Sequence, residues 1–116
     1  MPPTQIFQSH RLSIGRVSTA GNAYHIRFGT RQRQQYFSNL SNARAVALSL
    51  GNEHKTGRTQ CLCFCVMPDH VHWLIVLRQG TLGQSVHNIK RLSKHLSGIN
   101  IPVSYTHLTL PTTPYV

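Results

Sequence analysis

The sequence predicts a single α+β domain in which helices pack on one face of a mainly antiparallel sheet. The chain has 116 residues, which is enough for one hydrophobic core. Strand-like and helix-like hydrophobic patterns follow one another in the order strand, helix, strand, strand, helix. No internal repeat and no linker interrupts this order, so we expect one structural unit.

The first strand is predicted over residues 23–28, where apolar residues alternate with His25 and Arg27 after a Gly-Asn turn signal. Residues 38–41 offer helix caps, and small or apolar residues then recur at helical spacing. We expect this helix to end near residues 51–52. Residues 53–59 are polar, contain a glycine and are predicted to form a loop.

The second half supplies two more strands and a second helix. Strands are predicted over residues 60–67 and 70–77, joined by a Pro-Asp turn. The later strand is apolar on both faces beyond its histidines, so we expect it to be central and covered on both sides. Thr81 is a plausible cap for an amphipathic helix that ends at residues 97–98. This order suits a ferredoxin-like topology that lacks its closing strand.

The charge balance points to a polyanionic partner. The chain has 12 Lys and Arg residues but only two acidic residues, which gives a net charge of +10. Nucleic acid is the first expectation, because no apolar run approaches the roughly 18 residues of a membrane-spanning helix. Two basic segments are candidate nucleic-acid-binding sites, one in a loop and one on the second helix: Arg31, Arg33, Lys90, Arg91 and Lys94. The loop arginines precede Tyr36 and Phe37, which suits stacking of unpaired bases, although a solvated loop explains them equally well.

The amino terminus has neither a charged leader nor an apolar signal core, which favours a cytoplasmic, reducing compartment. Cys61, Cys63 and Cys65 alternate with apolar residues, so they should share one strand face. Their number and spacing fit neither a disulfide framework nor a zinc knuckle. We expect three small, buried side chains.

His70 and His72 are the most specific chemical signal in the chain. In a strand both side chains point to the same face, roughly 6–7 Å apart along the strand, and can share one divalent cation. A third ligand from another element and a substrate oxygen would complete such a site, which could then polarise a phosphate. Asp69 could tune the site, although its role in the turn also explains it. In the alternative interpretation, both histidines are structural and hydrogen-bonded at a sheet margin.

Three segments carry a resemblance to a known family. Residues 66–75, Val-Met-Pro-Asp-His-Val-His-Trp-Leu-Ile, resemble the His-hydrophobic-His motif of single-tyrosine HUH transposases, most closely the bacterial REP-associated tyrosine transposases. The Thr-Arg-Gln-Arg turn at residues 30–33 and the Ile-Lys-Arg-Leu-Ser segment at residues 89–93 resemble the parts of the family on either side of the motif. The similarity runs over residues 8–102.

The resemblance implies a ferredoxin-like endonuclease and strand transferase of single-stranded or hairpin DNA, dimeric when full length. It implies catalytic and metal-ligating roles for His70 and His72 with Mg²⁺ or Mn²⁺. It further implies a tyrosine hydroxyl that attacks the phosphate to give a 5′-phosphotyrosine. The second functional class left open is a metal-independent nucleic-acid-binding module with structural histidines.

The chain departs from this pattern after residue 102. The family's nucleophilic tyrosine lies on a later helix for which there is no space, so the nucleophile is unknown. The tyrosines present are Tyr24, Tyr36, Tyr105 and Tyr115. Residues 103–116 are rich in threonine and punctuated by proline, and residues 103–113 resemble a translated sequencing-library adapter. We therefore expect native sequence to stop near Pro102 and the chain to be an inactive fragment.

Overall fold

The computed structural model of the protein describes residues 18–110. Six main elements and two short 3₁₀ turns follow one another along this range. They are β1 (Ala23–Thr30), η2 (Arg31–Arg33), η3 (Tyr36–Ser38), α2 (Leu40–Thr56), β2 (Thr59–Met67), β3 (His70–Leu77), α3 (Leu82–Ser97) and β4 (Val103–Thr109). None of the helices in this range has the length and hydrophobicity needed to cross a membrane.

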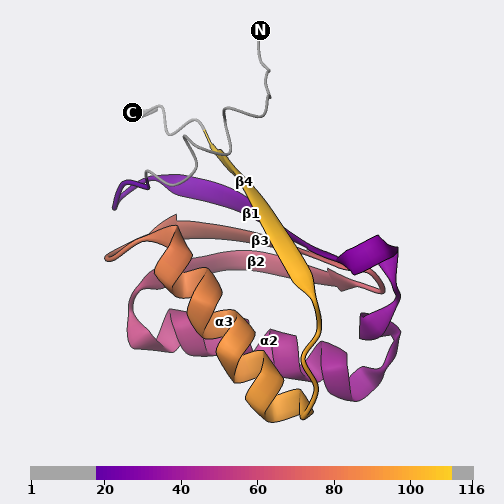
Figure 1. The fold of residues 1–116 in the computed structure, drawn as a ribbon. Coiled ribbons are helices and arrows are strands. Elements are labelled where there is room, and N and C mark those ends of the chain that lie inside the picture. The colour runs from indigo at the N-terminus through magenta and orange to yellow at the C-terminus, as the bar shows by residue number, and fades with distance from the viewer. Residues whose placement is uncertain (1–17, 111–116) are drawn as a thin grey trace, which may run out of the picture.

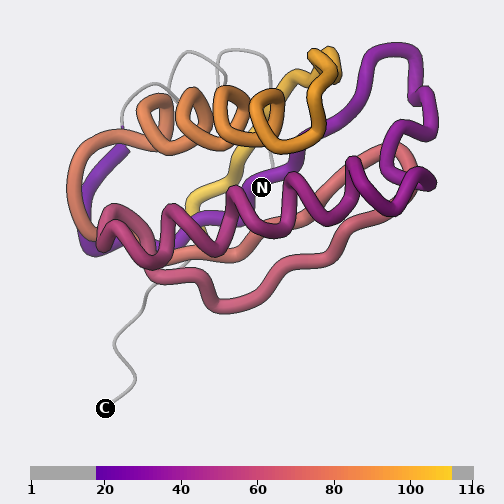
Figure 2. The backbone as a smooth tube through the Cα atoms, turned by 90° about the horizontal axis from the view of Figure 1, so that it is seen from below, coloured from indigo at the N-terminus to yellow at the C-terminus, as the bar shows by residue number. Residues whose placement is uncertain are grey.

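The strands form one four-stranded antiparallel sheet in the order β2-β3-β1-β4. Both helices lie on the same face of this sheet, and the opposite face carries no helix (Figure 1, Figure 2). The first and third strands are therefore neighbours at the centre, and each helix connects a central strand to an edge strand. This is the ferredoxin-like α+β arrangement that the element order predicts.

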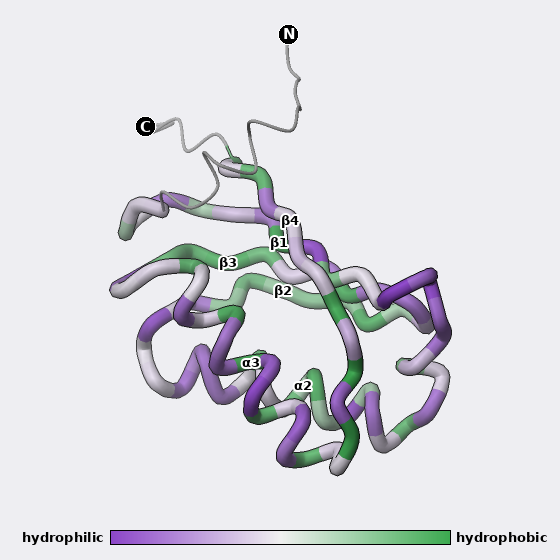
Figure 3. The backbone as a smooth tube through the Cα atoms, in the orientation of Figure 1, coloured by the Kyte–Doolittle hydropathy of each residue, from purple (hydrophilic) through white to green (hydrophobic). Residues whose placement is uncertain are grey.

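The hydrophobic core lies between the sheet and the helices. Alternate residues of β3 are completely buried there, with Trp73 and Ile75 at its centre. They meet apolar side chains from both helices, including Leu50 and Val86. Hydrophobic residues are concentrated on β3 and β2, whereas α3 alternates between hydrophobic and hydrophilic positions (Figure 3). Burial of this one face fixes which face of the sheet remains open to solvent.

The first helix is longer than the sequence predicts. It continues through Gly51 to Thr56 and ends at Gly57, whose left-handed φ of 85° favours glycine. The predicted loop is helical here because Glu53 faces inward, buried, where its carboxylate accepts hydrogen bonds from Arg58 Nε at 3.0 Å and Nη2 at 2.7 Å. The polar composition of residues 53–59 predicted a loop. The ion pair with Arg58 allows Glu53 to be buried, so the helix continues into this segment.

The second helix agrees with the prediction at both ends. Thr81 accepts a hydrogen bond from the backbone of Gln84, and the Gln84 side chain accepts one from the backbone of Thr81, which is a complete capping box. Gly98 ends the helix in the left-handed conformation, with φ of 81°.

Two expectations about strand burial are wrong. The central strand β3 is buried on one face only, because no helix covers the face that carries His70, His72 and Leu74. The cysteines are not buried: Cys63 and Cys65 are exposed and Cys61 is half-buried. They lie on the edge strand β2, where a bulge between Cys61 and Cys63 breaks the alternation, so the three do not share one face.

The closing strand that the sequence was expected to lack is present as β4. It is formed by the threonine-rich segment after Pro102 and pairs with β1 from Thr30 opposite Val103 to Tyr24 opposite Thr109. Its residues alternate in exposure, with Tyr105 and His107 half-buried on the helix side. The apolar-polar alternation of a strand was present, but the composition suggested a segment without regular structure.

Candidate functional site

His70 and His72 lie side by side on the open face of β3, as their spacing predicts. Their ring centroids are 4.8 Å apart and the ring planes are nearly perpendicular, at 89°. The intervening Val71 points into the core and is completely buried. The hydrophobic face of β3 therefore holds the strand rigidly while both imidazoles stay half-exposed.

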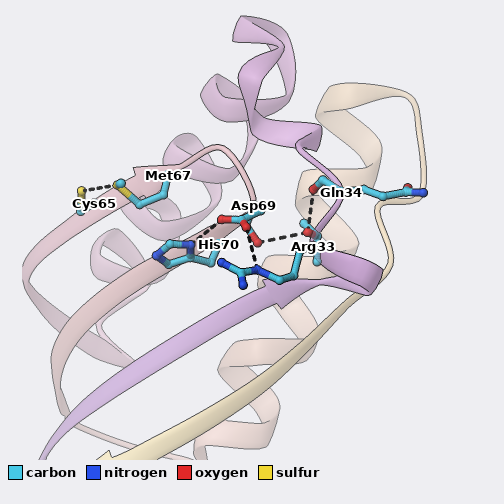
Figure 4. Close-up of polar contacts among 7 residues, drawn as sticks. Arg33, Gln34, Cys65, Met67, Asp69 and His70 are labelled. Carbon is cyan, nitrogen blue, oxygen red and sulfur yellow. Dashed lines mark hydrogen bonds and ion pairs between the residues drawn. The ribbon is translucent and has the colours of Figure 1, made fainter.

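The His70 ring is held by the preceding residue. Its Nδ1 lies 2.7 Å from Asp69 Oδ1, and the other carboxylate oxygen accepts a hydrogen bond from Arg33 Nε at 3.3 Å (Figure 4). The hydrogen bond to His70, with a smaller contribution from Arg33, lowers the pKa of Asp69. Asp69 therefore stays a carboxylate, and Nε2 is the ring nitrogen of His70 that this contact leaves available.

The turn after β1 brings Arg33 to this carboxylate. Gln32 and Arg33 both have positive φ, at 54° and 56°, which non-glycine residues adopt at a cost. The Thr30 hydroxyl stabilises the turn, because it lies 2.6 Å from the carbonyl oxygen of Gln34 and 3.1 Å from that of Asp69, and its one proton is shared between them. The turn and the Pro68-Asp69 connection are thus fastened to each other beside the histidines.

The His72 ring has a different partner, His25 on the adjacent strand β1. His72 Nδ1 lies 2.9 Å from His25 Nε2, with ring centroids 5.1 Å apart. Desolvation is the largest cause that lowers the pKa of His72, with smaller electrostatic contributions from the neighbouring His70, His25 and Arg27. This shift favours the neutral form of His72, which is the form that ligates metals.

The open face of β1 also brings Arg27 to the site. Arg27 pairs directly with His72 in the register, and Gly29 pairs with His70. A Cβ at Gly29 would lie 3.0 Å from Arg27 Nη1, so the absence of a side chain leaves room for the guanidinium beside the histidines. The sequence pattern predicts His25 and Arg27 on the polar face of a strand but does not assign them to the site. The local sequence pattern does not show that β1 is the strand that pairs with β3.

The two histidines fit the donor set of a divalent cation in part. Each has its Nδ1 next to a hydrogen-bonding partner, an arrangement found around metal-ligating histidines. Within residues 18–110, no group of three or more His, Cys, Asp or Glu side chains is arranged to hold a metal ion. The third ligand thus stays a prediction.

Comparison with known proteins gives the family. The family model described as "Transposase IS200 like" matches residues 18–107. The chain belongs to the IS200-like transposase family. The resemblance to single-tyrosine HUH transposases is therefore confirmed, and the matched range includes most of β4.

Two solved structures share the fold of this chain. A REP-associated tyrosine transposase bound to a REP hairpin aligns with a TM-score of 0.69 at 17% identity, over 84% of this chain. That alignment spans only 61% of the other protein. A protein from Deinococcus radiodurans R1, described as a transposase, aligns with a TM-score of 0.61 at 23% identity, over 84% of this chain and 85% of its own. No curated protein sequence matches the chain significantly.

The predicted nucleic-acid-binding residues fall into two groups. Arg31 and Arg33 lie in η2, exposed, and Arg33 reaches the histidine site through Asp69. Lys90, Arg91 and Lys94 are exposed on α3, in the helical layer on the other side of the sheet. Of these five residues, the structure therefore brings only Arg33 to the histidines, whereas Arg31 lies against Pro102, Val103 and Ser104.

The tyrosines of the sheet do not face the histidines. Tyr24 is buried on the helix side, where its hydroxyl accepts a hydrogen bond from the backbone of Thr19 at 2.8 Å. Tyr105 is on the same side, opposite Phe28 in the register. Tyr36 is half-buried in η3, and Tyr115 lies outside the described residues. The structure assigns no nucleophile among the three described tyrosines.

Proposed function

We propose that this chain is the metal-binding part of a transposase that cleaves and rejoins single-stranded DNA. The observation that carries the proposal is the pair His70 and His72 on the open face of the sheet, each oriented by a partner at Nδ1. The family match supports transposase activity, and we propose that the histidine pair binds the metal ion that this activity needs.

The proposed cation is Mg²⁺ or Mn²⁺, with His70 and His72 as its protein ligands. When bound, such an ion acts as a Lewis acid that polarises a phosphate oxygen. The two imidazoles offer nitrogen atoms as ligands, and Asp69 orients the His70 ring through the hydrogen bond at its Nδ1. Arg27 pairs with His72 in the register, and its permanent charge would attract a phosphate of the DNA backbone to the histidine pair.

The proposed partner is single-stranded or hairpin DNA. The net charge of +10 favours a polyanion, and one structure with this fold is of a transposase bound to a REP hairpin. Arg33 would contact phosphates near the histidines, and Arg31 would contact phosphates beside the start of β4. Lys90, Arg91 and Lys94 would contact DNA that passes the helical layer. Dimerisation is proposed only for a full-length protein.

The nucleophile is proposed to lie outside this chain. A tyrosine on a helix that follows the closing strand would complete the reaction. Residues 103–116, which include β4 and overlap the matched range up to residue 107, would then be adapter-derived. An intact genomic copy of the gene tests this. A coding sequence that continues differently after Pro102 supports the idea, and one that retains the same threonine-rich residues contradicts it.

Mn²⁺ titration separates this function from a metal-independent DNA-binding module. We expect the wild type to bind Mn²⁺ in calorimetry, and both His70→Ala and His72→Ala to lose that binding. His87→Ala, an exposed histidine on α3, is the matched control and should bind as the wild type does. No binding in the wild type, or equal binding in all four proteins, would favour the module with structural histidines.

A further inference from the structure

His25 has a position that the proposed metal site does not yet use. It lies on β1, half-buried, with its Nε2 directed at Nδ1 of His72 over 2.9 Å. The two rings border one surface hollow of about 320 Å³, which is also lined by Cys63, Cys65 and Leu74. In the sheet register His25 pairs with Leu74, so it lies diagonally across from His72 on the neighbouring strand. The hydrogen bond therefore joins the two side chains across the strands.

A metal-binding imidazole needs control over both of its nitrogens. The nitrogen that binds the ion must be unprotonated, so the other must carry the proton in the neutral ring. An acceptor at the second nitrogen fixes this tautomer and the ring orientation. Asp69 supplies such an acceptor to His70 at 2.7 Å, but the contact of His72 is with another imidazole.

We propose that His25 is a positioning residue for His72. In this arrangement Nε2 of His25 accepts a hydrogen bond from Nδ1–H of His72, which leaves Nε2 of His72 free to face a divalent cation. The role of the hydrogen bond in metal binding rests on the proposed function, whereas the hydrogen bond and the tautomer do not depend on any metal.

Two substitutions separate positioning from the other roles that His25 could have. His25→Gln keeps an acceptor oxygen for His72 but removes the imidazole nitrogen. His25→Phe keeps an aromatic ring of similar size but has no acceptor. A positioning role needs only the acceptor, a ligand role needs the imidazole nitrogen, and a packing role needs only the ring.

Calorimetric titration with Mn²⁺ gives the first readout. We expect His25→Phe to weaken Mn²⁺ binding roughly 10- to 100-fold, the usual effect of losing a partner behind a ligand, and His25→Gln to restore most of the affinity. Equal losses in both variants would show that His25 is itself a ligand and would overturn the proposal. Unchanged affinity in His25→Phe would overturn it as well.

Long-range ¹H–¹⁵N NMR of the metal-free protein gives the second readout and keeps the two proposals distinguishable. We expect the proton of neutral His72 on Nδ1 in the wild type and in His25→Gln, and on Nε2 in His25→Phe. His87→Phe on α3 controls for loss of a histidine and should leave His72 unchanged. A proton on Nε2 of His72 in the wild type overturns the positioning role. Failure of the wild type to bind Mn²⁺ overturns the proposed function instead.

Discussion

At the scale of single residues, the site is built from hydrogen bonds at the Nδ1 atoms of two histidines. Asp69, in the turn before β3, contacts the His70 ring, and His25, on the neighbouring strand β1, contacts the His72 ring. The Asp69 contact joins sequence neighbours and is therefore fixed by the turn. The His25 contact joins residues 47 positions apart and depends on correct pairing of β1 with β3.

Arg27 is expected to contact DNA at this site. Substitution Arg27→Ala should weaken single-stranded DNA binding several-fold and reduce the slope of log affinity against log salt by about 0.7, the value for one phosphate contact. Fluorescence anisotropy at several salt concentrations measures both quantities. Arg44→Ala, an exposed arginine on α2 in the helical layer, is the matched control. Equal losses in both variants would show that Arg27 contributes only general charge.

At the scale of elements, the end of α2 and the addition of β4 are the parts that local patterns did not predict. The last turn of α2 depends on an ion pair with Arg58, which follows the helix by two residues. Strand β4 depends on β1, which offers its free edge to any extended segment that follows α3. Both elements are fixed by contacts that form only in the folded domain.

Arg58→Ala tests the end of α2. Loss of the guanidinium leaves the Glu53 carboxylate buried without its partner, so we expect the free energy of unfolding to fall by about 3 kcal/mol. Urea denaturation measures this change. Lys55→Ala, an exposed position on the same helix, should stay within about 0.5 kcal/mol of the wild type. A similarly small change for Arg58→Ala would show that the ion pair does not hold the helix end.

His107 tests whether β4 is part of the folded domain. Burial lowers the pKa of His107 below its usual 6.5, and its ring packs against Tyr24 at 5.6 Å. The unfolded chain therefore binds a proton that the folded chain excludes, so the free energy of unfolding should fall as the pH drops below about 6.5. His107→Phe keeps the ring contact and should remove this part of the pH dependence. Urea denaturation at several pH values would contradict the account if both proteins respond alike.

At the scale of the whole molecule, much of the fold could be predicted from hydrophobic periodicity. The strand with alternating Tyr24, Ile26 and Phe28 and the helix capped by Thr81 both lie where the sequence predicts them. Periodicity reports burial relative to a neighbouring layer, and both elements contact that layer along one continuous face. Periodicity wrongly predicted that the three cysteines share one buried face. The bulge between Cys61 and Cys63 on the edge strand shifts the alternation, so Cys63 and Cys65 are exposed.

The candidate site was predictable only where it is local in sequence. His70 and His72 share a strand, so their spacing alone placed them together. His25 and Arg27 come from another strand, and only the order β2-β3-β1-β4 shows that they are neighbours of the pair. Lys90, Arg91 and Lys94 were predicted by charge alone, which does not specify the face of the molecule, and they lie in the helical layer.

Anomalous scattering from crystals grown with Mn²⁺ would locate the bound ion itself. We predict a peak within coordinating distance of Nε2 of both His70 and His72, and no such peak in crystals of His72→Ala. A wild-type crystal with no peak at the pair, or with its peak beside Cys63 and Cys65, would contradict the claim that the open face of the sheet is a metal-dependent site.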